Sequence, residues 1–454
     1  MRRGFLLNRD GLYAPYPTRN KKPTRDNRWL PVLDDARNLS PQPGCTTREL
    51  RMWARCPELS YEQKQKIRAL GRSQNLVFHN IKVGSVEVST LLDSTVVKLL
   101  RLHFAAPPTA LSDAIEFRHA RDKGVGVFAR QNISTGAILH VEVPAVVTQT
   151  TFALNSGMTA SEIYRELFQR VPEKTLPALL LLNDAHPGRY DVEEAILRSN
   201  ALAVKMPTIC LPSSAAMGHL GLFVKASRFN HSCSPNVIHR FDPESFALTI
   251  HSIRPINEGE ELLRSYIDLN SLPTREQRRL MLRSLCNFDC ACERCTLPSA
   301  AAIRESDLRR QKICQTKIET IEAPLIAWYL NNGRYDIQKV IDFHLAAVED
   351  MRVEGLHPET YFQHLRMLAI CFAAIEDTRR FRVWMGKARD VASANSDLDA
   401  AREMWEYIVE PDKYPEWGLA QRIRNRACSS CFITATTVQT SAVILKDLSQ
   451  PVGS

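Results

Sequence analysis

The most informative part of this 454-residue chain is the stretch 228–236, which reads Arg-Phe-Asn-His-Ser-Cys-Ser-Pro-Asn. Asn230 and His231 offer hydrogen-bond donors and acceptors for a polar ligand, and Pro235 ends the local structure. A single Asn-His pair is usually an ordinary structural element. Here the pair lies in a run of such residues that follows the apolar segment 220–226, which favours a binding role.

A cysteine cluster follows downstream, where residues 288–295 read Phe-Asp-Cys-Ala-Cys-Glu-Arg-Cys. Three cysteines in the spacing C-x-C-x-x-C can surround a tetrahedral zinc ion, which needs one more ligand. Cys286 is the nearest candidate for the fourth ligand, and Cys233 in the first stretch is the other. In a reducing compartment, closely spaced cysteines indicate metal binding before disulfides, and chance clustering of buried thiols is the less favoured alternative.

Two further motifs carry weaker signals when each is taken alone. Residues 123–129 read Lys-Gly-Val-Gly-Val-Phe-Ala, a glycine turn that would allow a ligand to approach the backbone, although such a turn is more often only a turn. Residues 259–268 read Gly-Glu-Glu-Leu-Leu-Arg-Ser-Tyr-Ile-Asp, with Tyr266 at the end of an expected strand. A tyrosine in this position is more often a packed side chain than a catalyst.

Together the four segments resemble the SET-domain protein-lysine methyltransferases, in particular the SMYD-like branch, over residues 115–298. The resemblance implies an S-adenosylmethionine-dependent enzyme that methylates a lysine side chain of a protein substrate, histone or non-histone. It also implies one structural zinc ion, held by Cys233 together with the trio Cys290, Cys292 and Cys295. In this interpretation the zinc ion carries no chemistry and ties two distant segments into one site.

The same resemblance assigns roles to individual residues. Tyr266 is the implied catalytic residue, which would orient the lysine amine beside the bound cofactor. The amine must be neutral to react, and desolvation in a narrow apolar channel favours the neutral form. The other implied cofactor-binding residues are Lys123, Gly124, Val125, Gly126, Asn200, Asn230, His231 and Phe288.

Two features depart from the SMYD-like pattern. Residues 130–209 contain no cysteine, so we predict that the cysteine-rich MYND zinc module, which the pattern places after the glycine turn, is absent. The N-terminal extension, residues 1–110, is foreign to the pattern, and we predict that it is partly disordered. Its role stays unassigned.

The rest of the sequence predicts an α+β fold in several parts. Short β-prone runs predict a SET-type β domain with its post-SET zinc segment at 111–298, which carries a helical insert at about 150–215. Apolar residues at helical spacing predict an α-helical, TPR-like domain at 303–425. The Ser/Thr-rich tail, residues 426–454, is predicted to be disordered.

Composition limits the location and the partners of the chain. Hydrophobic residues make up 44% and charged residues 24% of it, and we find neither an apolar run of about 18 residues or more, long enough to span a bilayer, nor a secretory signal. We therefore expect an intracellular protein of the nucleus and/or cytoplasm, monomeric and without a membrane partner. The formal net charge is +9, but the basic N-terminal segment is more simply a solvated tail than a nucleic-acid site.

Two other functions were weighed against the enzyme. A non-catalytic SET scaffold that binds protein partners in transcription would be favoured by the loss of Tyr266, which is present. A zinc-dependent nucleic-acid module would need a helix of base-reading residues after the ligands, whereas residues 296–301 read Thr-Leu-Pro-Ser-Ala-Ala. The motifs do not identify the substrate protein or the target lysine.

Overall fold

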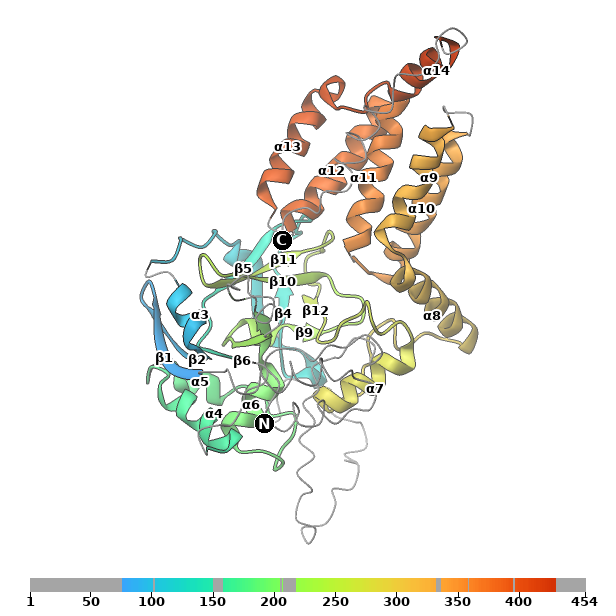
Figure 1. Ribbon diagram of the computed structural model, residues 1–454. Coiled ribbons are helices and arrows are strands. Elements are labelled where there is room, and N and C mark those ends of the chain that lie inside the picture. Colours follow the sequence, from blue (N-terminus) through green and yellow to red (C-terminus); the bar gives the residue numbers. More distant parts are fainter. Residues whose placement is uncertain are drawn as a thin grey trace, which may run out of the picture. The chain divides into compact units, whose positions relative to one another are not determined.

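The computed structural model describes residues 76–100, 103–149, 158–204, 206, 218–331, 336–357, 359–394 and 397–429. The predictions for the first 75 residues, for part of the insert and for most of the C-terminal tail lie outside these residues. The chain divides into two compact units (Figure 1). The first takes the residues up to Gln315 together with Asp350–Pro358 and Asp390–Leu398, and the second takes Thr316–Glu349, Glu359–Arg389 and the residues from Asp399 on.

Among the described residues, the first unit is built on four small sheets. The largest has the strand order β1-β2-β6-β8-β7, the second has the order β10-β11-β5, and two pairs join β3 to β4 and β12 to β9. The strands are β1 (Leu76–Val83), β2 (Val86–Asp93), β3 (Ile115–His119), β4 (Val125–Ala129), β5 (Ile138–Glu142), β6 (Val146–Gln149), β7 (Leu202–Val204), β8 (His219–Leu222), β9 (Asn230–His231), β10 (Val237–Asp242), β11 (Ala247–Ser252) and β12 (Leu263–Arg264).

Short helices accompany these sheets, and three of them lie in the range predicted for the helical insert. A capping box begins α4: the Thr159 hydroxyl accepts a hydrogen bond from the Glu162 backbone N–H, and the Glu162 carboxylate accepts one from the Thr159 backbone N–H. The helices are α3 (Ser94–Leu99), α4 (Ala160–Gln169), α5 (Leu176–Leu180), α6 (Val192–Asn200), α7 (Arg275–Cys286) and α8 (Ala300–Gln315), with 3-10 turns at Ser112–Ala114, Arg121–Lys123 and Ala226–Arg228.

Two apolar clusters form the core of the first unit. One lies among the sheets and includes Val127, Leu139 and Leu262, and the other includes Leu167 of α4 and Leu222 of β8. Strands β1 and β2 contribute several buried side chains to the first cluster, each worth about 1.5–3 kcal/mol of hydrophobic stabilisation. The last part of the predicted N-terminal extension is therefore an ordered part of this core.

The second unit is helical. Helix α11 is its most buried element, with Leu365, Leu368 and Phe372 almost completely inaccessible to solvent, and it contacts α9 and α14. The helices of this region are α9 (Ile318–Leu330), α10 (Ile337–Glu354), α11 (Glu359–Ala374), α12 (Thr378–Ala394), α13 (Leu398–Val409) and α14 (Leu419–Ser429), with a 3-10 turn at Pro411–Lys413. The predicted α+β class with a helical C-terminal region is confirmed.

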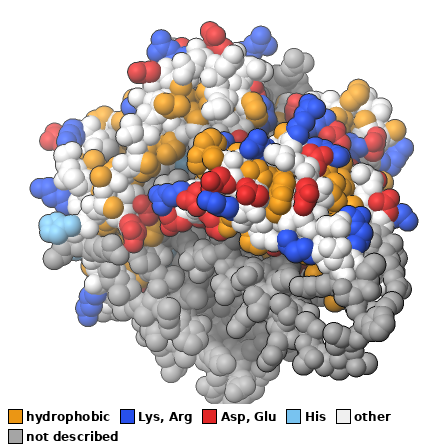
Figure 2. All heavy atoms as spheres, turned by 90° about the horizontal axis from the view of Figure 1, so that it is seen from above, with side chains coloured by type: hydrophobic (Ala, Val, Ile, Leu, Met, Phe, Trp, Pro, Cys, Tyr) orange, Lys and Arg blue, Asp and Glu red, His pale blue; other side chains and the backbone are white. Residues whose placement is uncertain are grey.

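The surface of the described residues is mixed in character. Figure 2 shows one face on which acidic, basic and apolar side chains are interspersed rather than gathered into a block of one charge. In the part of the chain that the structure describes, we find no helix with both the length and the apolar character needed to cross a membrane.

Candidate active site and metal centre

Two of the predicted motifs lie side by side as parallel segments. Strand β9 pairs in parallel with β12, so that Leu263 lies opposite Asn230. The buried side chain of Asn236 fastens the two segments: its Oδ1 accepts a hydrogen bond from the Leu263 backbone N–H at 2.7 Å, and its Nδ2 donates one to the Glu261 carbonyl oxygen at 2.8 Å. Sequence analysis gave Asn236 no role, yet this side chain brings the first motif against the third.

A cavity of about 380 Å³ opens beside these segments, within the usual size range of small-molecule sites. The cysteine loop and the charged side chains of Arg254, Glu260 and Glu261 line part of it. Five predicted site residues also line it, namely Lys123, Asn230, His231, Tyr266 and Phe288.

Glu261 connects the glycine turn to the Asn-His pair. Its carboxylate accepts a hydrogen bond from Asn230 Nδ2 at 2.9 Å and forms an ion pair with Lys123 Nζ at 2.7 Å. Sequence analysis missed Glu261, because Lys123 lies 138 residues upstream and no local spacing signals their contact. A pair of acidic residues directly after a glycine, Glu260 and Glu261 after Gly259, is the available signal in the sequence.

The glycine turn approaches this contact closely. Gly124 has a φ of +75°, a conformation that favours glycine. A Cβ atom on Gly126 would lie 2.8 Å from Glu261 Oε1 and 3.0 Å from Asn230 Nδ2. Val125 lies between Gly124 and Gly126 in the sequence. Its carbonyl oxygen accepts a longer hydrogen bond, 3.4 Å, from Asn230 Nδ2. Glycine at 126 is therefore required for the turn to pack against the Asn-His segment.

We expect Gly126→Ala to lower the free energy of unfolding by about 1–3 kcal/mol, because the added methyl group is too close to Glu261, Ala120 and Asn230 and forces them to move. Urea unfolding measures this change. The matched control is Gly386→Ala within α12, where a Cβ atom meets nothing within 4 Å and alanine is the better helix former by about 1 kcal/mol. Equal effects of the two substitutions would contradict the close approach at Gly126.

Tyr266 follows β12, and its contacts include two hydrogen bonds and an arginine against its ring. Its hydroxyl donates a hydrogen bond to the Phe229 carbonyl oxygen at 3.0 Å, and its backbone N–H donates one to His231 Nδ1 at 3.0 Å. The Arg264 guanidinium carbon lies 4.3 Å from the centre of its ring. Burial raises the pKa of Tyr266 above its ordinary value, although the Arg264 charge acts in the opposite direction. The phenol is therefore protonated at neutral pH.

His231 uses both of its ring nitrogens within the protein. Because Nδ1 accepts the Tyr266 N–H, the proton of the neutral ring is on Nε2, which donates to Cys233 Sγ at 3.3 Å. Burial lowers the pKa of His231 to about 3, which keeps the ring neutral. The imidazole thus connects the backbone of Tyr266 to Cys233, and it has no further nitrogen to offer a ligand.

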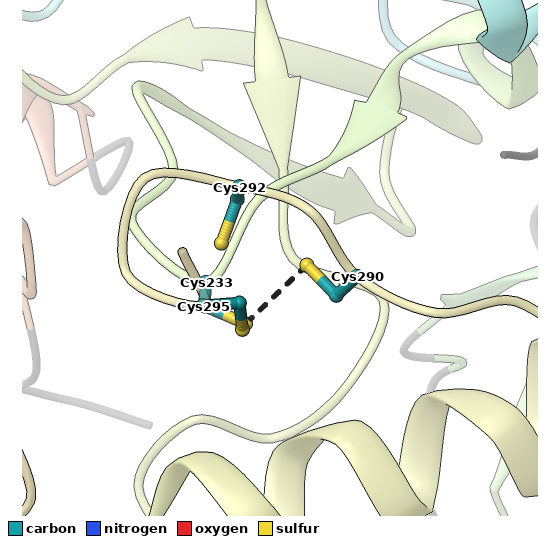
Figure 3. Close-up of side chains that lie close together, drawn as sticks. All are labelled: Cys233, Cys290, Cys292 and Cys295. Atoms are coloured by element: carbon teal, nitrogen blue, oxygen red, sulfur yellow. Dashed lines mark hydrogen bonds between the residues drawn. The ribbon is translucent and has the colours of Figure 1, made fainter. Parts of the chain in front are cut away.

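Four cysteines converge as the sequence predicts (Figure 3). Their sulfur atoms all lie within 4.8 Å of one another, with Cys233 Sγ 4.0 Å from Cys290 Sγ and 3.7 Å from Cys295 Sγ. In a tetrahedral site with zinc–sulfur bonds near 2.3 Å, neighbouring sulfurs lie about 3.8 Å apart. The four side chains, Cys292 included, therefore form a cluster of the right size and chemistry for a zinc ion.

Cys286, the other candidate for the fourth ligand, ends α7 and is not part of the cluster. Of the two candidates for the fourth ligand, Cys233 lies with the trio and Cys286 does not, and the role of Cys233 as a metal ligand stays a prediction. Within the described ranges, this is the one group of three or more metal-binding side chains at such distances.

Phe288 and Asn200 have different environments. The ring of Phe288 lies 6.4 Å from that of Tyr266 and 6.0 Å from that of His231, measured between centroids. Asn200 does not line the cavity; its Nδ2 donates to two carbonyl oxygens within the helical insert, and its own carbonyl oxygen accepts from the Ser227 hydroxyl. The predicted contact of Asn200 with a cofactor stays a prediction.

Known proteins and one family model are similar to this chain in sequence. Residues 124–267 match the family model described as SET domain. The chain is 32% identical over 192 residues to the histone-lysine N-methyltransferase set5 of Schizosaccharomyces pombe, a match that covers 42% of this chain and 53% of that protein. It is 33% identical over 171 residues to the histone-lysine N-methyltransferase SMYD3 of Mus musculus, covering 37% and 38% of the two chains. It is 39% identical over 215 residues to the N-lysine methyltransferase SMYD2-A of Danio rerio, covering 45% and 44%. The chain thus spans about half the length of these relatives or less.

Proposed function

We propose that this chain, whose residues 124–267 form a SET domain, is an S-adenosylmethionine-dependent protein-lysine N-methyltransferase. The observation that carries the proposal is that Tyr266, Asn230 and Phe288, which come from three separate motifs, line the same cavity. The names of its relatives, which are histone-lysine and N-lysine methyltransferases, support the same activity. The substrate we propose is a lysine side chain of a histone or another protein, in the nucleus and/or cytoplasm.

The residues that line the cavity suit the chemical groups of S-adenosylmethionine. Phe288 offers an aromatic face for the adenine, and Asn230 offers an amide for polar contacts. Lys123 and Glu261 provide one charge of each sign, which matches the carboxylate and the ammonium of the amino-acid part. When bound, the cofactor supplies a methyl group activated by its sulfonium.

Tyr266 is suited to orient the lysine amine. Its hydroxyl proton is committed to the Phe229 carbonyl oxygen, so the phenol oxygen presents lone pairs that can accept a hydrogen bond from an amine N–H. Removing the amine from water favours its neutral form. Holding the amine in line with the methyl group can lower the activation free energy by several kcal/mol, up to about 7–11 kcal/mol, relative to a random encounter in solution.

We further propose that Cys233, Cys290, Cys292 and Cys295 hold one zinc ion in a structural role. Zinc is the usual metal of a closed four-cysteine shell, and such a site does not take part in chemistry. Because Cys233 belongs to the Asn-His segment and the trio belongs to the loop after α7, the ion would fasten two walls of the same cavity.

The test is to incubate the purified chain with S-adenosylmethionine labelled on its methyl group and with fractionated cell protein, including histones. We expect label on lysine side chains of at least one fraction. Cofactor binding without transfer to any fraction would overturn the enzyme proposal in favour of a non-catalytic scaffold that binds protein partners.

We expect Asn230→Ala to weaken S-adenosylmethionine binding about tenfold or more, because the loss of one buried amide removes polar contacts worth about 1–3 kcal/mol. It also leaves Glu261 without its Asn230 donor. Isothermal titration calorimetry measures the affinity. Asn132→Ala is the matched control, since Asn132 is exposed and its side chain accepts only the Glu258 N–H among the contacts described. Unchanged affinity in Asn230→Ala would remove Asn230 from the cofactor site.

A further inference from the structure

The backbone of Cys233 is held by a buried arginine that lies outside the SET domain. Arg310 of α8 is completely buried. Its Nη2 donates hydrogen bonds to the Cys233 carbonyl oxygen at 2.8 Å and to the Glu354 carbonyl oxygen at 2.9 Å. Its Nε donates to Glu354 Oε2 at 2.7 Å. One planar guanidinium therefore fixes a metal-binding cysteine relative to the end of α10.

The carboxylate of Glu354 is equally buried and has all its partners on α8. Besides Arg310, the Ser306 hydroxyl donates to it at 2.7 Å and Arg309 Nε donates to it at 3.0 Å. Burial alone would raise the pKa of Glu354, but the hydrogen bonds from Ser306 and Arg310 bring it below its ordinary value. A buried ion pair of this kind is weak evidence for stability, because desolvation offsets most of its attraction. What it provides is a fixed position for the guanidinium.

The next residue, Gly355, lies directly against the residue after Cys233. Gly355 has a φ of +62°, and a Cβ atom there would lie 1.7 Å from Ser234 Oγ. Ser234 lines the cavity. The side chain of Arg310 thus contacts Cys233, and Gly355, in the turn after α10, lies against Ser234.

A second arginine holds the cysteine trio in a similar way. Arg275 Nε donates to the Cys295 carbonyl oxygen at 2.7 Å, and the Arg275 backbone N–H donates to Asp307 Oδ1 of α8 at 2.8 Å. Helices α7 and α8 therefore each send an arginine to a ligand of the cluster. A zinc ion with four thiolates carries a net charge of about −2, and nearby guanidinium groups favour such a charge in a buried place.

We infer that Arg310 is a positioning residue for the metal centre, which presets Cys233 at metal-binding distance from the trio. This inference rests on the proposed zinc site. It makes retention of the metal dependent on α8 and on the end of α10, which lie beyond the residues that match the SET domain.

The experiment measures the zinc content of the purified full chain and the rate of zinc release to a coloured chelator. It also records the visible spectrum after cobalt substitution, which reports whether four thiolates surround the metal. We expect Arg310→Met to release zinc at least tenfold faster than the unaltered chain and to show a disturbed cobalt spectrum. The matched control is Arg309→Met, which removes a neighbouring arginine and a contact to Glu354 but none to a cysteine. Its release rate should stay within about twofold of the unaltered rate.

The double variant Arg310→Met/Glu354→Gln separates positioning from simple charge balance. It removes the buried carboxylate that the single variant leaves with only Arg309 and Ser306 as partners, so any loss of stability from that charge is relieved. Fast zinc release that persists in the double variant supports the inference, and release restored to the unaltered rate overturns it. Should Arg310→Met fail to fold, Arg310→Lys replaces it, because lysine keeps the charge but lacks the fork that reaches Glu354 and Cys233 together. Release from Arg310→Lys at the unaltered rate would also overturn the inference. An unaltered chain that contains no zinc would instead refute the metal site itself.

Discussion

Tyr266→Phe is expected to lower the rate of methyl transfer by two or more orders of magnitude, about 3 kcal/mol of transition-state stabilisation, while cofactor binding stays nearly unchanged. The substitution removes only the hydroxyl. The ring keeps its contacts with Arg264 and His231, so the shape of the cavity is preserved. The amine, however, loses the oxygen that accepts its N–H, and the Phe229 carbonyl oxygen loses its donor.

Single-turnover rates with labelled cofactor and calorimetric binding separate the two effects. Tyr164→Phe is the matched control, because Tyr164 is also a buried tyrosine but belongs to α4 and does not line the cavity. We expect its transfer rate to stay within about twofold. If Tyr266→Phe transferred methyl groups as fast as the unaltered chain, the catalytic role of Tyr266 would be refuted. If affinity fell as much as the rate, Tyr266 would be a binding residue.

The cysteine trio could be recognised from the sequence, because few functions other than metal binding need cysteines at the spacing C-x-C-x-x-C. The residues alone left Cys286 and Cys233 open as the fourth ligand, and only the resemblance to the SET-domain family implied Cys233. The resemblance to the SET-domain family added the order of the motifs, and the match of residues 124–267 to the SET-domain model confirms the resemblance.

The contacts that position these residues were not predictable. Glu261 meets Lys123 because the segment before β12 lies beside β4, with an isolated antiparallel bridge between Phe128 and Glu261. Asn236 fastens Leu263 because β9 pairs in parallel with β12. The role of His231 changed for the same reason. The sequence presents an imidazole free to bind a ligand, whereas the fold commits both nitrogens to Tyr266 and Cys233.

The hairpin of β1 and β2 shows which strand pairing the sequence alone does not predict. An isolated two-stranded hairpin is marginal in water, and nothing local in the sequence reveals a third strand. In the fold β2 pairs in parallel with β6, more than 50 residues later, with Thr90 opposite Val147. Membership of the core therefore depends on a partner that local patterns do not identify, and this segment was grouped with the N-terminal extension.

Cys233→Ser is expected to reduce zinc affinity by about two orders of magnitude or more. Four ligands share an apparent binding free energy of about 10–16 kcal/mol in small zinc sites, so one ligand accounts for roughly 3 kcal/mol. Serine is a poor zinc ligand because its hydroxyl stays protonated at neutral pH. The change also removes the sulfur that accepts the Nε2 proton of His231, and through that ring it disturbs the backbone of Tyr266.

The loss should reach the cavity, because Cys233 lies 57 residues upstream of Cys290 and its proposed bond to zinc would join the two segments. We therefore expect zinc content below one ion per chain and at least tenfold weaker S-adenosylmethionine binding, measured by elemental analysis and calorimetry. Cys286→Ser is the matched control: Cys286 is close in sequence to the trio but outside the cluster, so zinc content should stay at one ion per chain. Zinc retained in Cys233→Ser and lost in Cys286→Ser would exchange their roles. Zinc lost with cofactor affinity intact would show that the metal stabilises the loop after α7 without shaping the site.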